Sequence, residues 1–228
     1  MFDLHSHILP GIDDGSRDLT MTKAMLEQMH RQGVFAVAAT PHFYANRDLP
    51  EAFLRRRDAA VEQVACLQGA LPKIIVGAEV AYFDGISRSG ILHKLQLGDS
   101  GLVLIEMPFC PWSGRMLREI CHLRAETGLT PVLAHIDRYH RQLRDCMPTL
   151  LDSGVLFQCN ADAFLSVMQR CWALRLLKQG YIHFLGTDAH NLTSRPPRLA
   201  EAYRVIYNRL GQDALDLLNL SAKKRLSL

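Results

Sequence analysis

Short hydrophobic runs and helical patterns alternate along the whole chain. Seven apolar runs predict strands at residues 2–4, 34–39, 73–77, 102–105, 130–134, 155–158 and 182–185. Most of these runs are continuous, without alternation of polar and apolar residues. Continuous runs are typical of parallel strands that are buried on both faces.

Helical patterns fill most of the intervals between the predicted strands. Thr20 is predicted to cap a helix in which methionines recur every four residues and which ends at Gly33. Further helices are predicted at residues 50–69, 114–128, 141–154, 163–180, 197–211 and 212–218. The final stretch, residues 221–228, is expected to be a frayed tail.

Seven β/α units in 228 residues favour a single domain, residues 1–228. The predicted fold class is α/β, and the order of elements favours a small barrel, one strand short of the eight-stranded form. An open parallel sheet is the alternative, because periodicity does not distinguish the two.

Composition excludes several classes of protein. The chain is 48% hydrophobic with a net charge of +3, contains no apolar run long enough to span a membrane, and lacks a basic and apolar leader. We therefore expect a cytoplasmic protein that neither inserts into a membrane nor binds nucleic acid. The six cysteines form no Cys-x-x-Cys pair, which favours reduced thiols. None has the Cys-x5-Arg spacing of a thiol phosphatase, since Arg115 follows Cys110 one residue too early.

Polar side chains follow the predicted strands where each strand ends. Because the carboxyl ends of barrel strands carry the active site, these side chains are expected to meet on one face. A buried group of imidazoles and carboxylates is costly unless a metal offsets its charge, so we predict a metal centre. The candidate ligands are His5, His7, Asp14, His42, Glu79, Glu106, His135, Asp188 and His190, and the sixth strand ends at Asn160.

The spacing of two ligand pairs supports this prediction. His5 and His7 are two residues apart, as are Asp188 and His190, and alternate residues of an extended segment point to the same side. The set exceeds the needs of one ion, and mixed nitrogen and oxygen ligands suit zinc, manganese or iron. A hydrolytic centre with two or three metals follows. His30, His93, His122 and His140 are expected at the surface, and His183 is expected to be structural.

Several motifs together resemble the polymerase and histidinol phosphatase (PHP) superfamily. Within it, the chain is most similar to the bacterial tyrosine-protein phosphatases of capsular and exopolysaccharide gene clusters. The matching stretches are Asp-Leu-His-Ser-His-Ile-Leu-Pro-Gly-Ile-Asp-Asp-Gly at 3–15, Ala-Thr-Pro-His at 39–42, Gly-Ala-Glu-Val at 77–80, Leu-Ile-Glu-Met-Pro at 104–108, Ala-His-Ile-Asp-Arg-Tyr at 134–139 and Gly-Thr-Asp-Ala-His-Asn at 186–191, with Arg-Pro-Pro at 195–197.

The resemblance implies a distorted (β/α)7 barrel of the PHP type that binds three divalent ions, with manganese favoured and iron or zinc as alternatives. One ion would be bound by His5, His7, Glu79 and Asp188. Glu79 would bridge to a second ion held by Glu106 and His135, and Asp14, His42 and His190 would bind the third.

Two arginines, Arg138 and Arg195, follow ligands closely enough to face the same cavity and are predicted to bind phosphate. The chain departs from the family pattern at Asp137, where a glutamate is usual, and at Phe43, where a histidine is usual. Asp137 is expected to re-aim Arg138. Phe43 is a candidate for substrate binding, as are Tyr82, Phe109 and Trp112, and core packing is an equal alternative for each.

The predicted reaction is hydrolysis of a phosphotyrosine ester by a hydroxide that bridges two ions. Asp14 or a metal-bound water is the candidate general acid. The implied partner is a phosphotyrosine-bearing protein, a tyrosine kinase of polysaccharide export. Three alternatives stay open at this point: a small-molecule phosphatase of the histidinol-phosphate kind, a phosphodiesterase on the same scaffold, and a metal-stabilised binding module without turnover.

Overall fold

A computed structural model describes residues 1–226 of the chain. Within this range the strands are β1 (Phe2–Ser6), β2 (Ala36–Ala39), β3 (His42–Phe43), β4 (Lys73–Val76), β5 (Glu79–Ala81), β6 (Leu102–Glu106), β7 (Thr130–Leu133), β8 (Leu156–Asn160) and β9 (Phe184–Gly186). The α-helices are α1 (Leu19–Arg31), α2 (Pro50–Ala65), α3 (Leu92–Leu95), α4 (Gly114–Thr127), α5 (His140–Asp152), α6 (Ala161–Leu165), α7 (Arg170–Lys178), α8 (Leu199–Leu210) and α9 (Gln212–Leu226), with 3-10 turns η1 (Ile86–Arg88) and η2 (Ile136–Arg138).

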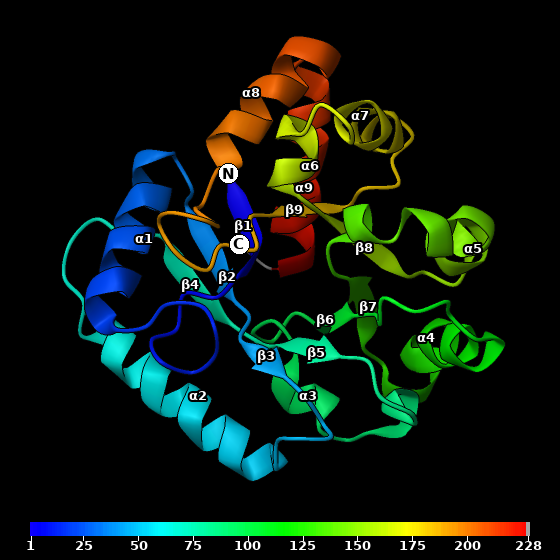
Figure 1. Cartoon of the computed structure of the whole chain (residues 1–228), viewed down its shortest axis with the longest axis horizontal. Coiled ribbons are helices and arrows are strands. Elements are labelled where there is room, and N and C mark those ends of the chain that lie inside the picture. Colours follow the sequence, from blue (N-terminus) through cyan, green and yellow to red (C-terminus); the bar gives the residue numbers. More distant parts are fainter. Residues whose placement is uncertain (227–228) are drawn as a thin grey trace.

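The strands form a curled parallel sheet that closes into a distorted barrel, which confirms the predicted fold class (Figure 1). The strand order is β1-β2-β4 in one part and β3-β5-β6-β7-β8-β9 in the other. A parallel bridge between Ser6 and Ala189 joins the first strand to the segment after the last. The alternative of an open parallel sheet is therefore excluded.

Two of the seven predicted strand regions continue as a second short strand. Pro41 separates β2 from β3, and the Gly77–Ala78 pair separates β4 from β5. Proline has no amide hydrogen to donate, so it interrupts a ladder. These breaks divide the sheet into its two parts. In the second part, His42 of β3 pairs with Glu79 of β5.

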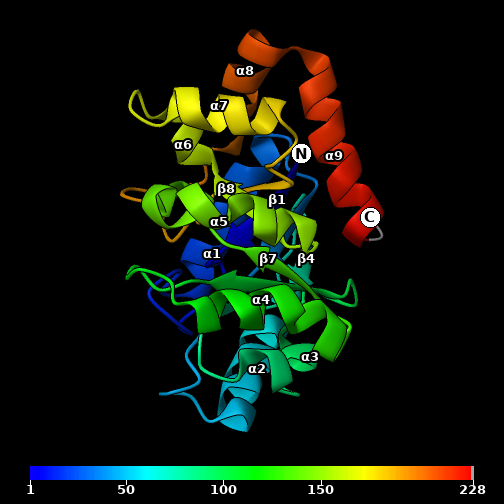
Figure 2. The ribbon, with the colours of Figure 1, turned by 90° about the vertical axis from the view of Figure 1, so that its right-hand side faces the viewer.

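Helices surround the barrel, and its two ends differ. Residues of α9, Ala222 and Leu226, pack with apolar side chains of β1, β2 and β8 in the interior of the barrel. Figure 2 shows α9 along one side of the molecule, away from the loops that follow the strands. The carboxyl ends of the strands lie on the opposite side, where α9 does not cover them.

Two differences from the predicted helices have a clear physical cause. Asp18, not Thr20, caps α1, because its Oδ1 accepts a hydrogen bond of 2.8 Å from the amide of Met21. The predicted helix at 163–180 is two helices, because the Arg170 guanidinium donates to the carbonyls of Phe164 and Leu165 and so ends α6.

The expected frayed tail is also wrong for residues 221–226, which complete α9; residues 227–228 lie outside the described part. Ala222 and Leu226 are both buried, and this burial stabilises the final turns. Among residues 1–226, no helix combines the length and apolar character required to cross a membrane.

Candidate metal centre

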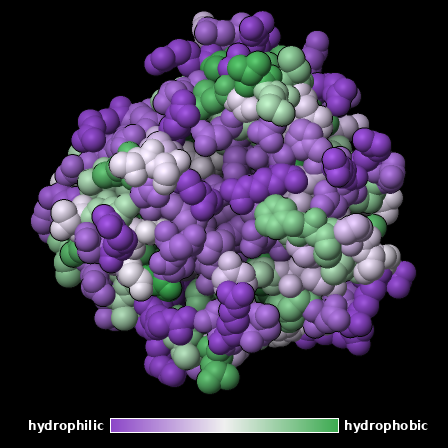
Figure 3. All heavy atoms as spheres, in the orientation of Figure 1, coloured by the Kyte–Doolittle hydropathy of each residue, from purple (hydrophilic) through white to green (hydrophobic). Residues whose placement is uncertain are grey.

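The polar residues predicted from the strand ends meet on one face of the barrel. Figure 3, in the orientation of Figure 1, shows a hollow near the centre of this face with hydrophilic residues around it. The structure brings together all nine predicted ligands, His5, His7, Asp14, His42, Glu79, Glu106, His135, Asp188 and His190.

The first group of ligand atoms lies at the end of β1. The Nε2 atoms of His5 and His7 are 3.2 Å apart, and each is 3.3–3.4 Å from Oε2 of Glu79. Oδ1 of Asp188 lies 3.6 Å from Nε2 of His5 and 3.4 Å from Nε2 of His7. Between Asp3 and Ser6, β1 has one residue more than β2, so this bulge includes His5.

The second group includes His135, Glu106 and His42, which lie around the same Glu79 carboxylate. Nε2 of His135 is 2.9 Å from Oε1 of Glu79 and 3.4 Å from Oε1 of Glu106. His42 reaches the same carboxylate from β3, with Nδ1 2.9 Å from Oε2 of Glu79. Glu79 therefore lies between two groups of imidazoles.

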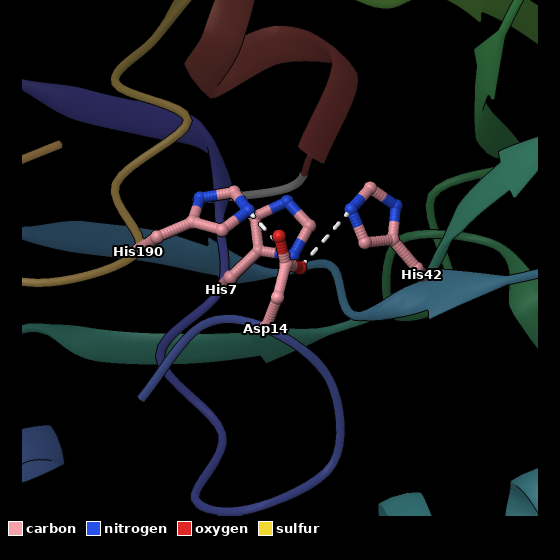
Figure 4. Close-up of side chains that lie close together, drawn as sticks. All are labelled: His7, Asp14, His42 and His190. Carbon is pink, nitrogen blue, oxygen red and sulfur yellow. Dashed lines mark ion pairs between the residues drawn. The ribbon is translucent and has the colours of Figure 1, made fainter. Parts of the chain in front are cut away.

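The third group lies at the outer edge of the site. Oδ1 of Asp14 is 3.5 Å from Nε2 of His42 and 3.4 Å from Nε2 of His190. Figure 4 shows these side chains converging with His7, the histidines from strands or strand ends and Asp14 from the loop after β1. Asp14 is 68% exposed, so this group opens to solvent.

The donor chemistry of these groups fits divalent cations. Nδ1 of His42, Oε2 of Glu79 and Nε2 of His190 are buried without an aligned hydrogen bond, although each has ligand-type atoms nearby. Burying polar atoms without partners costs free energy. A cation bound between nitrogen and oxygen lone pairs that point at one another would offset this cost, because it would coordinate them all. These residues are metal-binding clusters of histidine and carboxylate.

Two arginines lie beside these clusters, as the sequence predicted. Nη2 of Arg195 donates a hydrogen bond of 2.6 Å to Oδ2 of Asp188, and Nη2 of Arg138 donates to the same oxygen. Both guanidinium groups are about one-third exposed at the site. Asp188 therefore offers Oδ1 to His5 and His7 and Oδ2 to the arginines.

A match to a family model identifies the protein family of this chain. The model described as "Capsular polysaccharide synthesis, CpsB/CapC" matches residues 1–226. The chain belongs to this family. Its membership confirms the resemblance drawn from the motifs.

Relatives of this CpsB/CapC protein match along nearly the full length. Tyrosine-protein phosphatase CpsB of Streptococcus pneumoniae is 30% identical over 234 residues, which cover 92% of this chain and 91% of the relative. Tyrosine-protein phosphatase YwqE of Bacillus subtilis (strain 168) is 28% identical over 236 residues, with coverage of 98% and 90%.

Solved structures agree with this relationship. A chain from the crystal structures of YwqE from Bacillus subtilis and CpsB from Streptococcus pneumoniae, described as unique metal-dependent tyrosine phosphatases, matches with a TM-score of 0.87 and 26% identity, covering 100% of this chain and 94% of that one. Histidinol phosphate phosphatase of Lactococcus lactis shares the fold, with a TM-score of 0.54 and 16% identity over 96% and 93% of the chains. This CpsB/CapC chain is a metal-dependent phosphatase of the CpsB/YwqE type.

Burial and charge set the protonation of the ligands in this CpsB/CapC site. Burial raises the pKa of the Glu79 carboxyl, but the surrounding histidines outweigh burial and hold that pKa well below its usual value. Burial lowers the pKa of His135, while hydrogen bonds to Glu106 and Glu79 raise it to about 9. Burial and the charge of His7 lower the pKa of His190 to about 4. The Glu79 carboxylate is therefore ionised, and a bound cation would take the place of the proton on His135.

Two of the predicted ligands adopt left-handed backbone conformations. His135 has φ 33° and Asp188 has φ 52°, and within residues 1–226 these are the two non-glycine residues with positive φ. Such conformations are unfavourable for side chains with a Cβ and concentrate at functional sites. The turn at His135 begins η2 and thereby brings Arg138 towards Asp188.

Two supporting residues escaped the sequence analysis. Asp13 Oδ2 lies 2.7 Å from Nδ1 of His7 and accepts a hydrogen bond from the amide of His42. Gln158 Oε1 lies 3.2 Å from Nδ1 of His5 and accepts a hydrogen bond of 2.6 Å from the amide of His135. Gln158 is buried in β8, and a buried polar residue near a strand end is the signal that identifies it.

The predicted effect of Asp137 on Arg138 has a structural answer. Asp137 Oδ1 accepts a hydrogen bond of 2.8 Å from the amide of Asn160 at the end of β8. Its carboxylate therefore anchors η2 to the barrel. Arg138 still reaches Asp188, so the shorter side chain does not draw the arginine away from the site.

The four aromatic candidates for substrate binding differ in burial and in their contacts. Phe43, the candidate for substrate binding with core packing as its equal alternative, is only 1% exposed and packs edge-on against Phe53, so it is a core residue. Tyr82 donates its hydroxyl to Glu119, and the Trp112 indole donates to the Pro108 carbonyl. Phe109 is 61% exposed and lies against Tyr139, which contacts the His135 ring.

The remaining histidines lie outside the clusters. His30, His93 and His122 are exposed, as predicted. His140 was expected at the surface but is half-buried, because its ring stacks on Trp172 with centroids 4.0 Å apart. His183 is structural, since its Nδ1 accepts a hydrogen bond from the amide of Phe157.

Proposed function

We propose that this chain is a metal-dependent tyrosine-protein phosphatase in which residues 1–228 act as one phosphoesterase domain. The observation that carries the proposal is the meeting of nine ligand-type side chains with two arginines at the ends of parallel strands. Membership of the CpsB/CapC family, in which CpsB and YwqE are named tyrosine-protein phosphatases, supports the same activity.

The proposed site holds three divalent ions, with manganese favoured and iron or zinc as alternatives. His5, His7, Glu79 and Asp188 would hold one, and Glu79 with Glu106 and His135 would hold the second. Asp14, His42 and His190 would hold the third. The mixed imidazole and carboxylate ligands support this choice of metals. When bound, the ions supply Lewis acidity and lower the pKa of coordinated water towards neutrality.

Arg138 and Arg195 are proposed to bind the phosphate group. Each guanidinium has five N–H donors, and the described contact to Asp188 uses only Nη2. The remaining donors suit the planar, bidentate binding of phosphate oxygens. The shared Asp188 oxygen fixes both arginines at one side of the clusters, so they are placed before the substrate arrives.

Hydrolysis of phosphotyrosine depends little on proton transfer to the leaving group. A phenol has a pKa of about 10, so it leaves as phenolate far more readily than an alkoxide does. Asp14 is the proposed donor or acceptor at this position, because its exposed carboxylate lies at the open edge of the site. His42 and His190 face that carboxylate at 3.5 and 3.4 Å.

The proposed substrate is a phosphotyrosine-bearing protein, in particular a tyrosine kinase of polysaccharide export. The family description, capsular polysaccharide synthesis, supports this pathway. The opening of the third cluster to solvent also suits a protein segment better than a fully enclosed metabolite.

The direct test compares substrates on one enzyme preparation. Metal-stripped protein is reloaded with Mn²⁺ and assayed with a phosphotyrosine peptide and with histidinol phosphate. A His5→Ala/His7→Ala variant and the exposed His30→Ala/His93→Ala variant serve as matched partners. We expect Mn²⁺-dependent hydrolysis that favours the peptide in kcat/KM and is lost only when His5 and His7 are removed. A preference for histidinol phosphate would assign the enzyme to small molecules instead.

A further inference from the structure

A hollow of about 350 Å³ adjoins the outer edge of the metal centre. Asp14 and His42 line it on the side of the clusters, and Tyr44 and Arg47 line it on the far side. The rings of His42 and Tyr44 have centroids 5.3 Å apart, and the Arg47 guanidinium lies over the Tyr44 ring at 5.0 Å. These three side chains form a continuous row that leads out of the site.

The turn that carries Tyr44 and Arg47 is held in place by its own hydrogen bonds. The amides of Arg47 and Asp48 donate to the Tyr44 carbonyl, and the Tyr44 amide donates to Oδ2 of Asp48. Arg56 of α2 donates a hydrogen bond of 2.6 Å to Oδ1 of Asp48. The turn is therefore tied to α2 and presents its side chains without further ordering.

The charges around the hollow leave one cation without a carboxylate. Asp13 is bonded to His7, Asp14 faces His42 and His190, and Asp48 is paired with Arg56. In the described part of the chain, no carboxylate lies within ion-pair distance of Arg47. Arg47 is also exposed, so its charge faces the outer part of the hollow.

We propose that Tyr44 and Arg47 form a subsite that binds an acidic residue next to the phosphotyrosine of the substrate. The inference rests on the proposed phosphatase function and specifies its substrate class. An extended peptide advances about 3.3–3.6 Å per residue, so a residue one to three positions from the phosphotyrosine reaches the Arg47 end of the row. A carboxylate there pairs with the guanidinium, while the Tyr44 ring supports the peptide beside it.

Charge-swap kinetics test this subsite. Two phosphotyrosine peptides differ only in carrying Glu or Lys at the flanking positions, and the readout is the ratio of their kcat/KM values. The variants are Arg47→Gln and Arg47→Glu. Arg55→Gln is the matched control, because Arg55 is an exposed arginine of α2 that does not line the hollow.

We expect the wild-type protein to favour the Glu peptide by up to about fivefold, the upper limit for one exposed ion pair. The ratio should fall towards one in Arg47→Gln, invert in Arg47→Glu, and stay at the wild-type value in Arg55→Gln. It should also shrink in 0.5 M NaCl, because salt screens exposed charges.

A ratio that Arg47→Glu leaves unchanged would overturn the subsite, even where both peptides are hydrolysed well. An equal loss on both peptides would also overturn it, because it would assign Arg47 to the phosphate itself. Failure of the phosphatase proposal looks different: wild-type protein with full metal would hydrolyse neither peptide.

Discussion

Asp13 holds the His7 ring through a contact of 2.7 Å between Oδ2 and Nδ1. Burial raises the pKa of Asp13, but the hydrogen bond from His7 outweighs burial and lowers this pKa to about 2. The carboxylate is therefore ionised at neutral pH and accepts a hydrogen bond from Nδ1–H of His7. This arrangement leaves Nε2 of His7 free to face Glu79 and Asp188.

Removing the charge of Asp13 should weaken metal binding. Asp13→Asn is expected to lower the affinity of the site for Mn²⁺ by about ten- to a hundredfold, the usual effect of losing such a supporting carboxylate. Competition with a chelator measures this affinity. Asp99→Asn, at an exposed position, is the control. Wild-type affinity in Asp13→Asn would show that Asp13 does not orient His7.

Replacement of either arginine should impair phosphate binding. Arg138→Lys and Arg195→Lys are each expected to lower kcat/KM by about tenfold or more, because lysine keeps the charge but lacks the bidentate fork. Since both arginines bond the same Asp188 oxygen, the double variant should lose less than the product of the single losses. Initial rates with a phosphotyrosine peptide test both statements, and fully multiplicative losses would argue against coupling through Asp188.

Gly186 lies so close to His5 that a side chain does not fit. A Cβ at this position would lie 2.6 Å from the His5 Cβ and 3.0 Å from the His5 amide nitrogen. Gly186→Ala is therefore expected to lower both the stability to urea and the affinity for Mn²⁺. Gly90→Ala is the matched control, because nothing lies within 4 Å of its Cβ position. Equal behaviour of the two variants would contradict this packing.

His183 should make the fold sensitive to mild acid. Burial and the charge of Arg225 lower its pKa from the ordinary value of 6.5 to about 4. The folded protein thus keeps His183 neutral where the unfolded chain binds a proton, so His183 costs stability as pH falls from about 6.5 to 4. Urea unfolding at several pH values should show a shallower loss in His183→Gln than in wild type. A variant at the exposed His122, His122→Gln, should keep the wild-type slope.

Much of the site followed from the sequence because parallel strands bring their carboxyl ends to one face. His42, Glu79 and His135 are far apart in the chain, yet each follows an apolar run, and the barrel places them within a few ångströms. The pattern of strands therefore brings these three predicted ligands together without any knowledge of the loops.

The loops and helix ends were harder to predict. Asp13 and Asp14 are adjacent, and only the turn that bonds the Gly15 amide to Asp13 decides which of them supports His7. The periodicity of residues 163–180 continues through the break between α6 and α7, because the break depends on side-chain bonds from Arg170. Phe43 follows a ligand directly, but strand alternation turns it towards Phe53 in the core.

The central claim is that metal held by these clusters is required for hydrolysis of phosphotyrosine. The most direct measurement titrates metal-stripped protein with Mn²⁺ and follows bound metal and peptide hydrolysis in the same samples. We predict no hydrolysis without metal, a rise that tracks occupancy, and saturation at three ions per chain. Full hydrolysis by metal-free protein, or none at full occupancy, would contradict the claim.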